Sequence, residues 1–341
     1  MYFRVDGNDT IATGHVMRCL AIAGAMRKLG EESVFIIADD YPKKMIEKHG
    51  FSTICLDTVW NKMDTETDIM IECIKRHGIK KLLVDSYFVT EQYLNNLRKY
   101  TTVIYIDDLN LMQYPVDVLV CYSNTQQTDY LKDYQNTGTQ VWLGRKFTPL
   151  REEFFDCRYT LRDNPCKVLV TTGGTDRYNI SVKLAEKFIK EKQKTELMII
   201  AGRFNKNVPV LMSLQEEYPD YIHIFRKVDN MSELMQQCDI AISAGGTTLF
   251  ELCACKVPTI CFAFADNQLV LTEDFGNDGT MINAGDIRGD TDGKVEQIYK
   301  SAINLLNDSS LRQSYSEKMS SVVDGKGSIR LAEKIIYLKE K

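Results

Sequence analysis

The chain has 341 residues, of which 44% are apolar and 26% charged, and its formal net charge is −5. This length predicts two domains at roughly 100–200 residues each. The composition excludes a disordered chain and a coiled coil. The longest apolar run, residues 257–265, is far shorter than the ~20 residues that cross a bilayer. The net negative charge argues against a protein that binds nucleic acid through an overall basic surface.

The cysteines and the first residues bear on location. Ten cysteines are scattered along the chain and none forms a Cys-x-x-Cys pair. This argues against a disulfide framework or a zinc site and favours reduced thiols in a cytoplasm. Arg4 and Asp6 interrupt the first apolar stretch, so we expect no amino-terminal signal.

Short β-rich runs alternate with helical patterns along most of the chain. Strands are expected at 2–5, 34–38, 52–56, 81–84, 103–106, 118–121, 141–143, 166–171, 197–201, 221–225, 239–243 and 258–262. Helices are expected at 16–29, 42–48, 68–76, 91–99, 180–190, 208–217, 230–237 and 247–255, with helices dominating to the end. This alternation predicts βαβ units and mainly parallel sheets with helices on both faces.

The alternation of strands and helices stops between residues 145 and 165. This stretch has charged clusters, and we interpret it as a connector between domains. The predicted fold class is therefore α/β, with two doubly wound, Rossmann-like domains facing each other across a cleft. Residues 1–150 form the first predicted domain and 151–341 the second, whose last helix packs back on the first. Open parallel sheets bind ligands at the carboxyl ends of their strands, so the strand-to-helix loops are the candidate sites.

The first such loop runs from Asp6 to His15. Gly14 is expected to allow a tight turn at the helix start, where free amides favour an anion. His15 would face the cleft, and because an imidazole titrates near neutrality it is a candidate general base. A lone histidine is more often a capping or packed residue, but its place after this loop favours function. The Gly-x-Gly-x-x-Gly dinucleotide fingerprint is absent.

Two later loops carry paired glycines, Gly173-Gly174 and Gly245-Gly246. Paired glycines let the backbone approach a phosphate closely, although each pair alone is often only a tight turn. Neither is a P-loop, because no Gly-Lys-Ser/Thr follows. Glu251 lies about one helical turn beyond Thr247, within reach of a ribose beside a phosphate on that loop.

Polar side chains follow several other strands. They are Asp85, Ser86 and Tyr87, then Asp107 and Asp108, and Asp266, Asn267 and Gln268. Each group could instead have the structural role of capping a helix. For Asp107 and Asp108 this interpretation is as good as a role in the site.

At these loops the sequence resembles the UDP-sugar hydrolases of pseudaminic acid synthesis, which act on UDP-2,4-diacetamido-2,4,6-trideoxy-β-L-altropyranose. That family is similar in fold to the GT-B glycosyltransferases, notably the transferase that makes lipid II. The resemblance covers most of the chain and depends on the order and spacing of its motifs. They are Gly14-His15 with Arg18-Cys19-Leu20, Asp85-Ser86-Tyr87, Asp107-Asp108, Leu143-Gly144 with Leu150-Arg151-Glu152-Glu153-Phe154, Gly173-Gly174-Thr175-Asp176, Ser243-Ala244-Gly245-Gly246 and Asp266-Asn267-Gln268.

The resemblance implies that His15 is the catalytic base and that Tyr87 and Asn267 are the other catalytic residues. It implies that UDP binds the second domain, with its ribose near Glu251. The remaining expected substrate- or UDP-binding residues are Gly14, Arg18, Asp85, Gly173, Gly174, Gly245, Gly246, Thr247 and Gln268. Two positions depart from the family: many members have glycine where Ala12 stands and tyrosine where Phe147 stands.

The expected reaction is hydrolysis of a UDP-linked diacetamido-trideoxyhexose at its anomeric C–O bond. Water activated by His15 attacks opposite the leaving UDP and inverts C1, with no cofactor and no metal. The alternatives are a GT-B glycosyltransferase, a hydrolysing UDP-sugar 2-epimerase and a nucleotide-sugar-binding module. The expected partner is the UDP-sugar, without nucleic acid or membrane insertion, and the oligomeric state is open.

Overall fold

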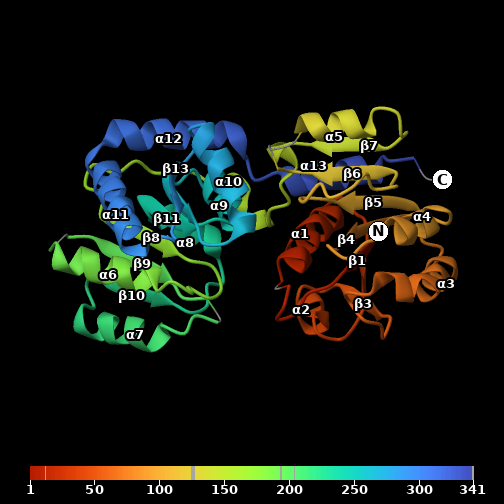
Figure 1. The fold of residues 1–341 in the computed structure, drawn as a ribbon, viewed down its shortest axis with the longest axis horizontal. Helices are drawn as coiled ribbons and strands as arrows, with labels where there is room; N and C mark the ends of the chain where they lie inside the picture. The colour runs from red at the N-terminus through yellow and green to blue at the C-terminus, as the bar shows by residue number, and fades with distance from the viewer. Residues whose placement is uncertain (12, 124–126, 193, 203, 340–341) are drawn as a thin grey trace. The chain divides into compact units, whose positions relative to one another are not determined.

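The computed structural model describes residues 1–11, 13–123, 127–192, 194–202 and 204–339 (Figure 1). Ala12, which departs from the resembled family, lies outside the described residues. The chain forms two compact units. The first unit consists of Met1–Glu152 and Lys326–Lys341, and the second of Glu153–Gly325. The final segment thus belongs to the first unit, whereas the predicted second domain runs over residues 151–341 with its last helix packed back on the first.

The first unit contains a seven-stranded sheet in which every described pairing is parallel. In spatial order its strands are β3 (Ser52–Cys55), β2 (Val34–Ile37), β1 (Tyr2–Val5), β4 (Lys81–Asp85), β5 (Thr102–Ile106), β6 (Val118–Cys121) and β7 (Gln140–Leu143). The helices of this unit are α1 (Gly14–Lys28), α2 (Lys43–Lys48), α3 (Thr67–His77), α4 (Glu91–Arg98), α5 (Gln127–Tyr134) and α13 (Gly327–Ile336). Short 3-10 turns lie at Met63–Glu66 and Arg145–Phe147.

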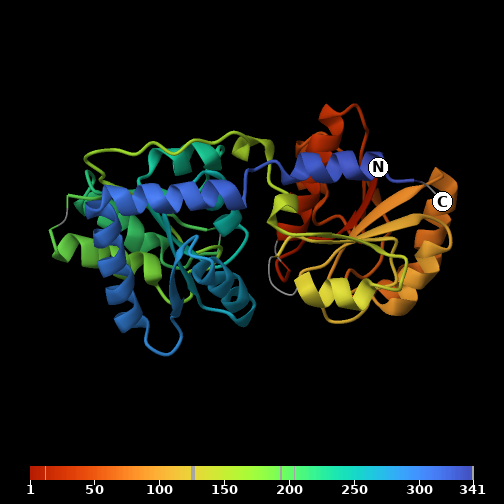
Figure 2. The same ribbon diagram turned by 90° about the horizontal axis from the view of Figure 1, so that it is seen from above.

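Side-chain alternation divides the first sheet into two apolar faces. Leu82 and Val84 of β4 join one core cluster with residues of α3 and α4. Because successive strand residues point to opposite faces, Leu83 and Asp85 lie on the other face. That second face is covered by α1, beside which α13 packs in both views (Figures 1 and 2).

The second unit contains a six-stranded sheet that is also parallel at every described pairing. In spatial order its strands are β10 (Ile222–Phe225), β9 (Glu196–Ile200), β8 (Lys167–Thr171), β11 (Ile240–Ala244), β12 (Thr259–Ala263) and β13 (Ile282–Asp286). Its helices are α6 (Ile180–Lys190), α7 (Val208–Glu217), α8 (Met231–Gln237), α9 (Thr248–Ala254), α10 (Asp266–Asn277), α11 (Thr291–Asn307) and α12 (Ser309–Val322). A 3-10 turn, Glu152–Phe154, lies where the first unit ends.

The α/β class with two doubly wound sheets, predicted from the alternation, is confirmed. Two elements were not expected, α5 and β13. The sequence of β13 is Ile-Asn-Ala-Gly-Asp, which is poor in β-branched and aromatic residues. It forms a strand because β12 supplies a pairing edge, with a register irregularity at Cys261 and Ala263.

Both sheets have a topological switch point, the place where consecutive connections turn to opposite sides. In the first sheet β1 pairs with both β2 and β4, and in the second β8 pairs with both β9 and β11. Loops after these central strands diverge and leave room for a ligand at the carboxyl edge. The loop after β1 leads to His15 in the first turn of α1, and the loop after β4 carries Tyr87. The loops after β8 and β11 carry the two glycine pairs.

Candidate functional site

One turn of α1 places three side chains toward the carboxyl end of β4. His15, Arg18 and Cys19 stand at i, i+3 and i+4, which share one face of a helix. Asp85 is the last residue of β4 and points to the face that α1 covers. The helix period and the strand alternation therefore bring together residues that lie 66 to 70 positions apart in the chain.

His15 and Arg18 share the Asp85 carboxylate. The distance from His15 Nδ1 to Asp85 Oδ1 is 2.6 Å. Arg18 Nε donates to Asp85 Oδ2 at 2.6 Å and Arg18 Nη2 donates to Oδ1 at 2.5 Å. Asp85 is 1% exposed and His15 6%, so the contacts are shielded from water.

The charge on Asp85 determines which nitrogen of His15 carries the proton. Burial alone would raise the pKa of the Asp85 carboxyl, but Arg18 and His15 outweigh burial and hold that pKa well below its usual range. An ionised carboxylate only accepts hydrogen bonds, so the proton of the 2.6 Å contact belongs to Nδ1. Within the described residues Nε2 has no hydrogen-bond partner, which leaves its lone pair available to a water molecule.

A second carboxylate, Asp108 in the loop after β5, lies on the other side of Arg18. Arg18 Nη1 donates to Asp108 Oδ2 at 2.9 Å and to the Tyr122 hydroxyl oxygen at 2.6 Å. Burial raises the pKa of Tyr122 to about 12, so this hydroxyl stays neutral. From the sequence, helix capping and a functional role are equally good interpretations of Asp107 and Asp108, and the structure separates the two residues. Asp107 accepts the backbone N–H groups of Leu109 and Asn110, the geometry of a turn cap.

Tyr87 borders this cluster and is 43% exposed. Its ring meets the His15 ring edge-on with centroids 4.5 Å apart, and its hydroxyl donates to Asp108 Oδ2 at 3.1 Å. Burial and the Asp108 carboxylate raise the pKa of Tyr87 well above its ordinary value. The hydroxyl is therefore a hydrogen-bond donor rather than a base.

Gly14 does not play the backbone role expected for it. It is the first residue of α1, it is absent from the glycines with positive φ, and a Cβ there would meet nothing within 4 Å. The turn therefore does not require glycine, and an open approach to the start of α1 is what Gly14 provides.

The glycine pairs of the second unit end neighbouring strands. Gly173 has φ +75° and, like Gly174, is exposed after β8. A Cβ on Gly245 would lie 2.8 Å from Gln268 Cβ, because α10 packs directly on this loop, whereas a Cβ on Gly246 would meet nothing within 4 Å. The N–H of Gly245 already donates to the carbonyl of Phe262. An anion at this loop would therefore be bound by Gly246 and the residues that open α9.

The other expected residues of the second unit lie close to this loop in the chain. Thr247 is exposed and precedes α9, in which Glu251 is half-buried. Gln268 Oε1 accepts the N–H of Phe264, which fixes the first turn of α10. Asn267 is exposed in that turn. Asn267 and His15 thus belong to different units.

A buried ion cluster beside the first loop was not predicted from the sequence. Arg4 Nε donates to Glu66 Oε1 at 2.7 Å, and Arg4 Nη1 donates to Asp6 Oδ2 at 2.5 Å. Tyr93 donates to Glu66, and Asp6 accepts the N–H of Ala38. An arginine within a strand buried on both faces was the available signal. This cluster holds the chain where β1 leads into the His15 loop.

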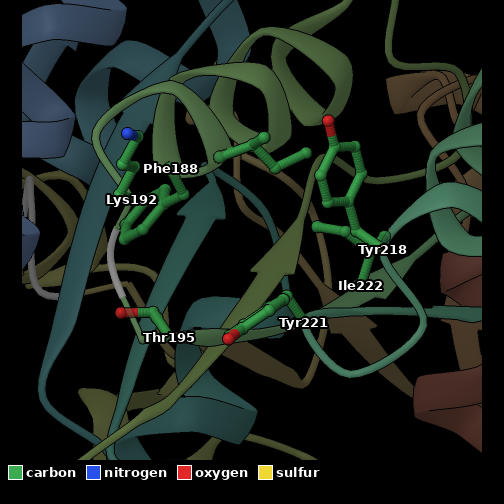
Figure 3. Close-up of a pocket in the computed structure, with 7 residues that line it drawn as sticks. Phe188, Lys192, Thr195, Tyr218, Tyr221 and Ile222 are labelled. Atoms are coloured by element: carbon green, nitrogen blue, oxygen red, sulfur yellow. The ribbon is translucent and has the colours of Figure 1, made fainter.

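Among the described residues, no group of three or more histidine, cysteine or acidic side chains could hold a metal ion. A pocket of about 230 Å³ in the second unit is shown in Figure 3. Thr195 and Tyr221 of its lining directly precede β9 and β10, so it opens at the amino ends of these strands. It therefore lies at the edge opposite to the glycine loops and is not part of the candidate site.

Comparisons with known proteins bear on the fold and on the second unit. Residues 167–301 match the family model described as the glycosyltransferase family 28 C-terminal domain. In fold the chain is similar to the crystal structure of Acinetobacter baumannii MurG, with a TM-score of 0.73 and 13% identity over 99% of both chains. The chain has the GT-B fold.

Curated relatives are distant. The chain is 26% identical to the Bacillus subtilis spore coat polysaccharide biosynthesis protein SpsG, over 58% of each chain. It is 22% identical to the Campylobacter jejuni UDP-2,4-diacetamido-2,4,6-trideoxy-β-L-altropyranose hydrolase, over 78% of this chain and 92% of that protein. The match spans about half the length of three curated relatives, with shares of 54%, 58% and 44%. No helix within the described ranges has the length and apolar character needed to span a membrane.

Proposed function

We propose that the protein hydrolyses a UDP-linked diacetamido-trideoxyhexose at the anomeric C–O bond, with inversion, and releases UDP and the free sugar. The observation that carries the proposal is the short contact between His15 and ionised Asp85, which leaves Nε2 of His15 as a free base. The distant likeness to the Campylobacter jejuni hydrolase supports this choice of substrate.

In the proposed reaction, Nε2 of His15 removes a proton from a water molecule as its oxygen attacks C1 of the sugar. The C1–O bond to the β-phosphate breaks, and its electron pair leaves with UDP. General-base assistance of this kind is typically worth about 10²–10⁴-fold in rate. Asp85 holds the ring and stabilises the imidazolium that forms, as in other histidine–carboxylate pairs. Tyr87 and Asn267 are proposed to orient the sugar or the water.

The second unit is proposed to bind UDP. Gly246 and the residues opening α9 would donate to the diphosphate and stabilise its growing charge, and Glu251 would contact the ribose. The exposed loop at Gly173 and Gly174 ends the neighbouring strand β8 and is proposed to complete the nucleotide site. The family match over residues 167–301 supports this assignment.

The decisive experiment is incubation with UDP-diacetamido-trideoxyhexoses in the absence of any acceptor, with UDP release followed by chromatography. Free sugar plus UDP supports the hydrolase, and NMR of the sugar shows whether C2 is also inverted, as an epimerase would require. Release that depends strictly on an acceptor would replace the proposal with a glycosyltransferase. Absence of turnover would replace the proposal with a nucleotide-sugar-binding module that has no enzymatic activity.

His15→Asn should lower kcat by about 10²–10⁴-fold, because the base is lost. UDP affinity, measured by calorimetry, should stay within about threefold, because UDP is assigned to the other unit. His77→Asn, in the last turn of α3, is the matched control and should leave the rate unchanged. Near-normal turnover by His15→Asn would remove this residue from the mechanism.

A further inference from the structure

Arg18 uses all three of its guanidinium nitrogens within the His15 cluster. Nε and Nη2 bind Asp85, and Nη1 binds Asp108 and Tyr122. The guanidinium is buried between the two carboxylates. A side chain held at this many points cannot reach a substrate without breaking contacts, so its function must be exerted through its neighbours.

The nearest such neighbour is His15. Arg18 Nη2 lies 3.1 Å from His15 Nδ1, and both atoms face Asp85 Oδ1. Asp85 attracts a proton to the ring, whereas the guanidinium charge at this distance opposes the addition of a second one. Two further neighbours among the described residues are neutral: the Tyr87 hydroxyl, whose ring contacts His15, and the Cys19 thiol beside Asp85, whose pKa burial raises.

We propose that Arg18 is a positioning residue that keeps His15 neutral and protonated on Nδ1, with the lone pair of Nε2 free. Its bidentate contact fixes the Asp85 carboxylate as the acceptor of the Nδ1 proton. Its positive charge balances that carboxylate, so that the ring is not trapped as an imidazolium. This inference rests on the proposed role of His15 as a base.

The first test measures the ring directly and needs no turnover. In protein carrying ¹⁵N-labelled histidine, two-bond ¹H–¹⁵N correlation spectra should show the Nδ1–H form of His15 in the wild type. Arg18→Gln removes the cation beside Nδ1, so the signals of the doubly protonated imidazolium of His15 should persist to a higher pH than in the wild type. An unchanged His15 spectrum and titration in Arg18→Gln would overturn the inference.

Asp108→Asn provides a second variant that spares the buried Asp85 pair. It removes a negative charge from the far side of Arg18, so the imidazolium should be lost at a lower pH than in the wild type. The two variants should thus shift the titration in opposite directions, which a general loss of structure would not do. Shifts in the same direction would also overturn the inference. Arg27→Gln, an exposed arginine of α1 that contacts His49 and Gly50, is the matched control and should shift nothing.

Turnover adds a readout that separates the inference from the proposed function. Arg18→Gln should lower kcat by about 10–100-fold, the size of effect known for groups that orient metal-bound histidines, with KM changed less than threefold. Partial recovery at higher pH should follow, as the imidazolium loses its extra proton. If the wild-type protein releases no UDP, the proposed function alone is refuted. If the wild type is active but the His15 titration is the same in Arg18→Gln, the role of Arg18 is refuted.

Discussion

At the scale of single residues, the candidate site depends on charges that are matched inside the first unit. Asp85 and Asp108 flank one guanidinium, and His15 takes up the remaining acceptor capacity of Asp85. Removing one partner of a buried pair costs more than the pair contributes, because the other charge is left without compensation. The same residues that define the chemistry therefore also contribute to stability.

Asp85→Asn should lower the free energy of unfolding at pH 7 by about 3–5 kcal/mol, because Arg18 loses its buried carboxylate. The pKa of Asp85 is lowered on folding, so the stability it contributes is complete above its unfolded value of about 3.9 and is lost as the pH falls below it. Urea unfolding at several pH values should show a constant difference from about pH 5 to 8 that shrinks in acid. A difference that widens in acid would contradict the assigned charge. Asp129→Asn, an exposed position on α5, should change stability by less than about 0.5 kcal/mol.

At the scale of elements, the glycines of one loop have different functions. Gly245 is required by the close approach of α10, whereas Gly246 borders open space. From the sequence both belong to one phosphate-binding motif, because a motif does not reveal which neighbour packs on it. Only the position of α10 distinguishes a packing glycine from one that faces a ligand.

Gly245→Ala and Gly246→Ala should therefore separate stability from binding. Gly245→Ala should cost about 1–3 kcal/mol of stability, since its methyl group would lie within 3 Å of both Gln268 and Thr272. Gly246→Ala should fold with nearly wild-type stability but bind UDP less tightly, because the methyl group occupies the approach to the loop. Thermal unfolding and UDP calorimetry of both variants test this. Wild-type stability of Gly245→Ala would contradict the packing role of Gly245. Unchanged UDP affinity of Gly246→Ala would contradict the binding role of Gly246.

At the scale of the whole molecule, the first unit is completed by the end of the chain. The chain leaves it after Glu152, forms the second unit and returns as α13, whose Leu331 and Ile335 are buried. The return path is tight: a Cβ on Gly327 would lie 2.1 Å from the carbonyl oxygen of Thr148, so only glycine fits there. Residues 1–150 therefore lack one of the helices that cover their own sheet.

Leu331→Ala should lower the stability of the first unit by about 2–5 kcal/mol, because it removes a buried side chain from α13. Hydrogen exchange should accelerate at amides of β1 and β4 and stay unchanged at β8 and β11. Tyr337→Ala, at the carboxyl end of the same helix and 85% exposed, should have little effect. Equal acceleration in both sheets would contradict the assignment of α13 to the first unit alone.

The sequence by itself determined the features that depend on local periodicity. Alternating strands and helices predicted the doubly wound class. Polar or glycine-rich loops at strand ends indicated His15, Tyr87 and both glycine pairs as candidate site residues. The strand β13 escaped prediction because its residues have little intrinsic preference for a strand, and pairing with β12 decides its conformation.

Only the tertiary structure decided which charged side chains meet. From the sequence alone, Asp85 could equally be a helix cap. Arg4 could only be recognised as an interruption of an apolar strand. Strand order places β1 beside β4, which brings His15 and Arg18 of α1 onto Asp85 and buries Arg4 against Glu66. Hydrophobic periodicity acts over a few residues, whereas these ion pairs join positions more than sixty residues apart, so their partners are fixed by the order of the strands.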